Sequence, residues 1–348
     1  MTILAFLLWS LLKVAVVTVV MLMGIAYTVL LERKLVGRIQ NRWGPTRVGP
    51  FGLLQPLVDG AKSFLKEDII PTAVYRPLYL LAPIISLGCA LIVIAVIPFG
   101  APGMGPKGFD FFEISNINVG VLVILGVTSI GVYGIALAGW SSNNKYSLLG
   151  SLRSSAQLIS YELALGLSLV GVVLRAGSLN LRVIVEQQAR LGIATWNVFG
   201  GLQFVAFFIY LMAAFAETNR SPFDLPEAES ELTGGYHTEY SSMKFAMFFM
   251  AEYGNMINVG CVATLLFLGG WTSPLGNLFP PLQNALLNAF LPLFWFVFKV
   301  FGFLCLYVWV RGTLPRFRYD QLMHFGWRIL LPLAILNIVG TSLWLAYR

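Results

Sequence analysis

The chain has 348 residues, of which 57% are hydrophobic and 11% are charged, and its mean hydropathy is +0.78. Soluble domains carry roughly 25% charged residues, so this composition excludes a soluble globular protein, which could not cover its surface with polar groups. The net charge of +7 is no sign of nucleic-acid binding. The basic residues flank apolar segments, where membrane topology and anionic head groups explain them.

Eight apolar segments follow one another along the chain. Each can form a helix of about 20 residues, the length that crosses a hydrocarbon core of about 30 Å, and none shows the alternation of a β-barrel strand. They cover residues 5–31, 77–98, 118–139, 156–175, 196–216, 245–269, 288–311 and 329–347. The sequence therefore predicts an all-α integral membrane protein, a single polytopic domain over residues 1–348 with about eight transmembrane helices.

The lysines and arginines are distributed unevenly between the loops. Of 23 in the chain, 16 lie in or at the edges of the loops after the first, third, fifth and seventh segments, against 4 for the other loops. By the positive-inside rule, these odd-numbered loops are cytoplasmic and both termini lie on the periplasmic side of a bacterial inner membrane.

The cysteines do not form a ligand pattern. Cys89, Cys261 and Cys305 lie far apart, each inside an apolar segment. No paired spacing of the kind used for iron–sulfur or zinc sites occurs. We interpret these residues as small buried hydrophobic side chains and expect no metal or iron–sulfur cluster in this chain.

The first loop is strongly basic and leads into an amphipathic segment. Five cations open it: Arg33, Lys34, Arg38, Arg42 and Arg47. Over residues 51–66, apolar side chains recur at steps of three and four, and the polar ones occupy the opposite stripe. This pattern is typical of a helix lying at the membrane surface.

The loop over residues 217–244 is acidic, which the positive-inside rule does not explain. It carries one basic residue before position 240, Arg220, and six acidic ones: Glu217, Asp224, Glu227, Glu229, Glu231 and Glu239. A solvated acidic loop would account for the charge alone. However, apolar residues such as Phe223 interrupt the acidic run, and no flexible linker joins it to the flanking spans. We therefore interpret the loop as functional.

Four ionisable residues lie within apolar segments. Lys13, Glu162, Glu252 and Lys299 each meet an insertion cost of about 2.5–3.5 kcal/mol at the centre of a membrane helix. Lys13 is near a segment end and can extend to the interface. Glu162 and Glu252 are short and have polar neighbours. Because burial favours the proton-bound form of a carboxyl group, both are candidate proton carriers.

Three stretches of this sequence together resemble one family, the H-type (quinone-chamber) membrane subunits of respiratory complex I, in their bacterial form. They are ERKLVGRIQNRWGPTRVGPFGLLQPLVDGAKSFLKED, ISYELALG and AETNRSPFDLPEAESELTGGYHTEYSSMKFAMFFMAEYGNM. The resemblance implies a membrane component of the proton-translocating NADH:quinone oxidoreductase of the respiratory chain. Such a component carries no flavin or iron–sulfur cluster. It forms a chamber for quinone together with hydrophilic quinone-module subunits, and it adjoins membrane pump subunits.

The resemblance also implies roles for individual residues. Those expected to line the quinone chamber or its access path are Arg33, Lys34, Arg38, Asp59, Phe64, Arg220, Phe223 and Asp224. Those expected to couple quinone chemistry to proton movement are Glu162, Glu217, Glu227, Glu229, Glu231, Glu239 and Glu252. No complete active site is expected in this chain alone.

Two alternatives stay open at this point. The first is the homologous membrane subunit of an energy-converting hydrogenase or a related dehydrogenase, against which the segment GPTRVGPFGLLQPLVDGAK argues. The second is a stand-alone ion transporter, against which the lack of a visible internal repeat argues. Ubiquinone and menaquinone are equally compatible with the sequence.

Overall fold

The computed structural model describes residues 3–102, 112–189, 192–224, 234–275 and 285–347. Over these residues the chain is helical and contains no strand. Its longer helices are α1 (Ile3–Ile39), α3 (Arg76–Ile94), α4 (Gly120–Ser141), α5 (Lys145–Ala176), α7 (Gln203–Glu217), α9 (Ser242–Phe267), α10 (Ala285–Thr313) and α12 (Leu331–Ala346). Shorter ones are α2 (Gln55–Leu65), α6 (Leu181–Gln188) and α11 (Tyr319–Phe325), which continues through a π turn into α12.

Six helical segments within this part of the chain are long and apolar enough to cross a membrane: α1, α3, α4, α5, α10 and the continuous α11–α12 segment. The prediction of an all-α membrane protein is confirmed. The count of eight spans depends on α7, which has only 15 residues, and on α9, which has 26 but carries Glu252, Asn255 and Asn258. It stays a prediction.

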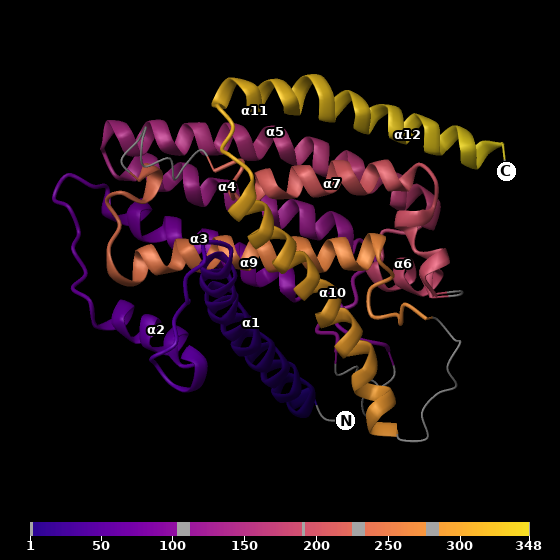
Figure 1. Cartoon of the computed structure of the whole chain (residues 1–348), viewed down its shortest axis with the longest axis horizontal. Coiled ribbons are helices and arrows are strands. Elements are labelled where there is room, and N and C mark those ends of the chain that lie inside the picture. Colours follow the sequence, from indigo (N-terminus) through magenta and orange to yellow (C-terminus); the bar gives the residue numbers. More distant parts are fainter. Residues whose placement is uncertain (1–2, 103–111, 190–191, 225–233, 276–284, 348) are drawn as a thin grey trace.

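The helix α9 lies in the middle of the molecule. Figure 1 shows α3, α4, α5, α7 and α9 running roughly side by side, with α1 and α10 crossing them obliquely and α11–α12 lying along α5. Most residues of α9 from Ala251 onward are buried, including Leu265, Leu266 and Phe267. Neighbouring helices therefore surround α9, which explains how it keeps polar side chains that a lipid-facing helix would not.

The odd-numbered loops meet at one end of the bundle. Hydrogen bonds joining them are Ile69 N to Ser241 Oγ (2.9 Å), Asn144 Nδ2 to Glu239 Oε1 (2.6 Å) and Phe317 N to Pro222 O (3.0 Å). The even-numbered loops are joined in the same way, by Asn180 Nδ2 to Asn116 Oδ1 (2.8 Å) and Ile193 N to Pro274 O (3.1 Å). Helices that cross in alternating directions produce this grouping, as the charge pattern requires. Which end faces the cytoplasm stays a prediction.

The amphipathic segment starts as a tight turn and becomes helical later than predicted. Phe51 and Gly52 have φ values of +53° and +76°, a left-handed conformation that an α-helix cannot contain. At Gly52 a side chain would collide with the carbonyl of Pro45, so glycine is required there. The helix α2 begins at Gln55, and its apolar residues Phe64 and Leu65 are exposed.

Lys299 fastens the loop that follows α9. Its ammonium group is buried and donates hydrogen bonds to the carbonyl oxygens of Leu268 (2.7 Å), Gly270 (2.8 Å) and Thr272 (2.8 Å). It also lies 4.3 Å from the centre of the Trp196 ring. A cation at the C-terminus of a helix interacts favourably with the helix dipole. These contacts explain why a lysine is tolerated in an apolar segment.

Replacing Lys299 with methionine should lower the stability of the protein by about 2 kcal/mol, because buried carbonyl oxygens lose a charged donor. The measurement is the midpoint of thermal inactivation of the purified membrane complex. Lys13→Met is the control, since Lys13 is only half-buried and its ammonium donates to Glu113 O at 3.2 Å. Equal midpoints for the two variants would contradict this role for Lys299.

Candidate functional site

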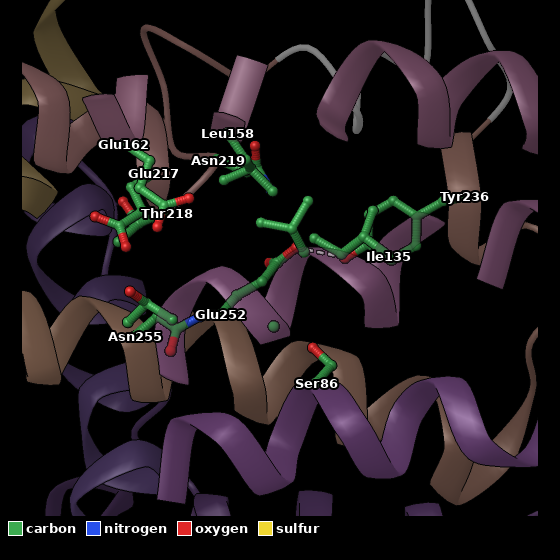
Figure 2. A pocket seen from close by; sticks show the side chains of 13 residues that line it. Ser86, Ile135, Leu158, Glu162, Glu217, Thr218, Asn219, Tyr236, Glu252 and Asn255 are labelled. Atoms are coloured by element: carbon green, nitrogen blue, oxygen red, sulfur yellow. Dashed lines mark hydrogen bonds between the residues drawn. The ribbon is translucent and has the colours of Figure 1, made fainter. Parts of the chain in front are cut away.

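A small cavity lies between α3, α4, α5, α9 and the end of α7. Its volume is about 30 Å³, enough for about two water molecules at roughly 10–15 Å³ of occupied volume each. The residues that line this acidic cavity are Ser86, Thr128, Gly131, Val132, Ile135, Leu158, Glu162, Glu217, Thr218, Asn219, Tyr236, Glu252 and Asn255. Figure 2 shows its three carboxyl side chains together with Asn219 and Asn255.

The acidic cavity has space for water that can form hydrogen bonds with buried polar atoms that have no partner in the protein. Among the described residues, Glu217 Oε2 and Asn219 Oδ1 are buried and have no protein hydrogen-bond partner. Buried polar atoms are normally paired with protein or water, and both residues line this cavity. A chain of polar groups around space for water is an arrangement through which protons can move between carboxyl groups.

A much larger cavity, of about 790 Å³, lies at the C-terminal end of α1. It is lined by Val29, Glu32, Arg33, Val36, Gln40, Arg42, Trp43, Gly44, Pro45, Phe249, Tyr253, Arg311 and Gly312. Its walls therefore come from α1, the residues just after it, α9 and α10. We call it the α1 cavity. Its lining combines apolar and aromatic side chains with a few charged ones, as in sites that bind small organic molecules.

Arg220 connects the two cavities. Its guanidinium group lies 3.9 Å from a carboxylate oxygen of Glu32, in the α1 cavity, and 3.8 Å from one of Glu252, in the acidic cavity. The three residues are 4%, 7% and 8% exposed. Charges in so little solvent are screened weakly and interact strongly. Arg311 forms a second ion pair with Glu32 from α10.

Tyrosine hydroxyl groups hold both carboxylates in place. Tyr253 donates to Glu32 Oε2 at 2.7 Å. Tyr236 donates to Glu252 Oε1 at 2.9 Å, a hydrogen bond drawn in Figure 2. The ring of Tyr253 also lies 4.0 Å from the guanidinium carbon of Arg220. Aromatic rings stabilise a buried cation by cation–π attraction. We call Arg311, Glu32, Arg220 and Glu252 the charge chain.

The end of α7 determines where Arg220 lies. Asn219 has a φ of +50°, a left-handed conformation that ends a helix and that asparagine tolerates. The buried side chain of Gln157, on α5, donates to the carbonyl oxygens of Ala216 (2.7 Å) and Phe223 (2.8 Å). It therefore holds both sides of the turn, and Arg220 enters the space between α1 and α9.

The structure brings together some of the residues that were predicted to line the quinone chamber or to couple quinone chemistry to proton movement. Glu162, Glu217 and Glu252 line the acidic cavity, and Arg33 lines the α1 cavity. Arg220, predicted for the quinone chamber, lies between the two cavities. Five predicted residues are therefore parts of one connected site.

Other predicted residues have different partners. Asp224 pairs with Arg316 at 2.9 Å, and Phe223 stacks on Phe317 with ring centres 5.5 Å apart. Glu239 accepts a hydrogen bond from Asn144. These contacts fasten the loop after α7 to the loops after α10 and α4.

The remaining predictions concern the basic loop and the acidic run. Asp59 pairs with Arg33 at 2.7 Å, and Lys34 donates to the carbonyl of Phe51 at 2.5 Å. Arg38 and Phe64 are exposed, and neither is among the described residues that line the two cavities. Three further predicted residues lie outside the residues that the structure describes: Glu227, Glu229 and Glu231.

Sequence reasoning missed Glu32, Arg311, Tyr236 and Tyr253 as site residues. Glu32 and Arg311 each mark the end of a long apolar segment. Arg311 was counted among the basic residues of the membrane boundary, and Glu32 received no interpretation. A signal was present, because an acidic residue directly after an apolar run departs from the basic flank that topology favours. Tyr236 and Tyr253 gave no signal, because a tyrosine in an apolar context is ordinary.

Together the fold and the site define a class: a polytopic membrane protein that buries a chain of ionisable groups between two cavities. Residues 12–342 match the family model for NADH dehydrogenase. The chain is 60% identical to an H-type subunit of NADH-quinone oxidoreductase from Koribacter versatilis, with 99% of this chain and 98% of the relative covered. It is 48% identical to the H-type subunit of Solibacter usitatus (99% and 98% covered) and 50% identical to that of Leptospira biflexa (94% and 92%).

The chain therefore belongs to the NADH dehydrogenase family, among its H-type members, and is a membrane subunit of the enzyme complex. The resemblance read from the sequence is confirmed. Within the described residues, no group of three or more His, Cys, Asp or Glu side chains could hold a metal ion.

Replacing Glu32 with glutamine should lower the stability of the protein far more than replacing Asp59 with asparagine. Glu32→Gln removes the carboxylate that Arg311 pairs with and one of the two that Arg220 pairs with, and should cost about 3–5 kcal/mol of stability. Asp59 pairs with Arg33 near the surface, with side chains 33% and 49% exposed, so its loss should cost less than about 1 kcal/mol. Thermal stability of the two purified variants checks the difference, and equal losses would contradict it.

His237, in the loop before α9, should make the protein less stable in acid. Burial lowers its pKa from 6.5 to about 4. Below pH 6.5 this imidazole is therefore protonated in the unfolded chain but stays neutral in the folded chain down to about pH 4. The free energy of unfolding falls as the pH is lowered from 6.5 to 4. His237→Asn should remove this loss. The test compares inactivation midpoints of the two proteins at pH 7 and pH 4.5; a difference independent of pH would contradict it.

Proposed function

We propose that this chain forms the membrane-level quinone chamber of a proton-translocating NADH:quinone oxidoreductase, and that it couples quinone reduction to proton movement. The observation that carries the proposal is Arg220, which lies within 4 Å of one carboxylate in each cavity. The names of the relatives quoted above favour quinone over the substrates of the hydrogenase and transporter alternatives.

The α1 cavity is the proposed quinone site. At about 790 Å³ it lies within the range of roughly 300–1,000 Å³ that is usual for small-molecule sites. Val29, Val36 and Phe249 can contact an apolar ring, while Arg33, whose guanidinium group carries several N–H donors, offers hydrogen bonds to quinone oxygens. Both ubiquinone and menaquinone satisfy these requirements.

The position of the α1 cavity supports the proposed assembly. The cavity lies at the end of the bundle where the odd-numbered loops meet, and Trp43 on its lining is 83% exposed. Hydrophilic quinone-module subunits would cover this end and deliver electrons, and membrane pump subunits would adjoin the helices. By the charge rule this end is cytoplasmic, with eight spans, both termini periplasmic and the protein in the bacterial inner membrane.

Coupling would act through the charge chain. Reduction of a quinone takes up two electrons and two protons, so the charge in the α1 cavity changes during turnover. At 4 Å, a unit charge acts on another with about 4 kcal/mol in an effective dielectric of about 20. A change near Glu32 would therefore alter how strongly Arg220 is attracted to Glu252, and with it the proton affinity of the acidic cavity. In this proposal, protons then move between Glu217, Glu252 and Glu162.

Replacing Glu217 or Glu229 with glutamine should lower quinone-coupled turnover severalfold without loss of the assembled complex, because an amide cannot exchange a proton. The measurement is NADH-driven quinone reduction and proton uptake in vesicles that contain the purified complex.

The matched control is Glu186→Gln. Glu186 is exposed on α6, at the opposite end of the bundle, and pairs with Arg182 one helical turn away. Its loss should leave both rates unchanged. Full activity and pumping in both test variants would refute the coupling proposal.

A further inference from the structure

Glu162 has a hydroxyl partner from a neighbouring helix. The hydroxyl group of Ser129, on α4, is hydrogen-bonded to Glu162 Oε1, on α5. The same hydroxyl lies 2.9 Å from the backbone carbonyl oxygen of Leu125, one turn earlier in α4. Glu162 also lines the acidic cavity, so Ser129 contacts one of this cavity's three carboxyl groups.

A serine hydroxyl has one proton, whereas Ser129 has two acceptors within reach. If Glu162 is ionised, Ser129 donates to the carboxylate. If Glu162 is protonated, the carboxyl group donates to Ser129 Oγ, and Ser129 turns its own proton to the Leu125 carbonyl. Both arrangements use the same heavy-atom positions and satisfy every polar group in the contact. Only the hydroxyl proton rotates.

This two-way contact matters because Glu162 lies in a membrane-spanning helix. A carboxyl group whose partners fit one protonation state only would pay a penalty of about 1–3 kcal/mol in the other, through an unsatisfied buried atom. Ser129 gives Glu162 Oε1 a hydrogen-bond partner in both states. Glu162 can therefore gain or lose a proton without rearranging the helices.

On α4, Ser129 lies between the residues that line the acidic cavity and those that are exposed. The cavity-lining residues of α4 are Thr128, Gly131, Val132 and Ile135. The exposed residues Leu122, Gly126, Ile130 and Tyr133 repeat at helical spacing, and by that spacing Ser129 lies beside them. The Glu162–Ser129 pair thus extends from the cavity toward the outer surface of α4.

We propose that Ser129 is a positioning residue that lets Glu162 change its protonation state in place, so that Glu162 can exchange protons with the other carboxyl groups of the acidic cavity. This inference rests on the proposed function, because it assigns Glu162 to the proton path. It adds a residue that neither the sequence pattern nor the charge chain identifies.

The experiment uses the assembled complex in vesicles and measures protons moved per electron as a function of pH. Ser129→Ala should shift this profile by about one pH unit, equivalent to a tenfold change, because the hydrogen bond that the ionised carboxylate loses is stronger than the one that the neutral carboxyl group loses. Ser129→Thr keeps a hydroxyl group and should restore the wild-type profile. Ser129→Val has nearly the volume of the threonine variant without the hydroxyl and should behave as Ser129→Ala does.

Ser168→Ala is the control for loss of a serine hydroxyl from a spanning helix, since Ser168 on α5 donates to its own helix at Leu165 O; it should leave the profile unchanged.

If the threonine and valine variants give the same profile, the inference is overturned, even if the alanine variant does not assemble. Glu162→Gln separates the two proposals. If it abolishes pumping while Ser129→Val leaves it normal, only this inference fails. Normal pumping in Glu162→Gln would overturn the proposed role of Glu162, and this inference with it.

Discussion

The arrangement depends on one buried cation, Arg220, held between the carboxylates of Glu32 and Glu252. Removing three charges from water is costly unless they neutralise one another. Arg311 provides the second positive charge, so the chain of four residues is neutral overall. Tyr236 and Tyr253 fix the carboxylates. Because these residues come from α1, α9, α10 and the turns beside α7 and α9, the charge chain also constrains how the helices pack.

The helices show the consequences of this constraint. α9 supplies Glu252 and Tyr253 and can do so because other helices surround it. α1 continues to Ile39, so that Glu32 reaches the level of Arg220 and α1 still forms a wall of the larger cavity. Lys299, on α10, donates hydrogen bonds to the C-terminal end of α9 and to the loop that follows it. A helix held at both ends can keep two adjacent side chains on two different cavities.

Much of the fold could be read from the sequence, since long apolar segments and uneven charge are direct consequences of the bilayer. The acidic residues in apolar context, Glu162 and Glu252, were also recognisable, because their cost in lipid implies a role. The partners of Arg220 were not predictable, because they depend on contacts 188 positions apart for Glu32 and 32 for Glu252. Asp224 and Glu217 belong to the same acidic loop, yet Asp224 pairs with Arg316 of another loop while Glu217 lines the acidic cavity. A charged residue in an apolar segment can be recognised from the sequence, but its partner depends on how the helices and loops pack.

The central claim is that Arg220 transmits a change of charge from one cavity to the other. The most direct test is the number of protons moved per electron by an Arg220→Gln complex in vesicles, with assembly verified by its subunit content. The account predicts that quinone reduction continues at a measurable rate while the proton-to-electron ratio falls well below that of the wild type. A wild-type ratio in this variant would contradict it.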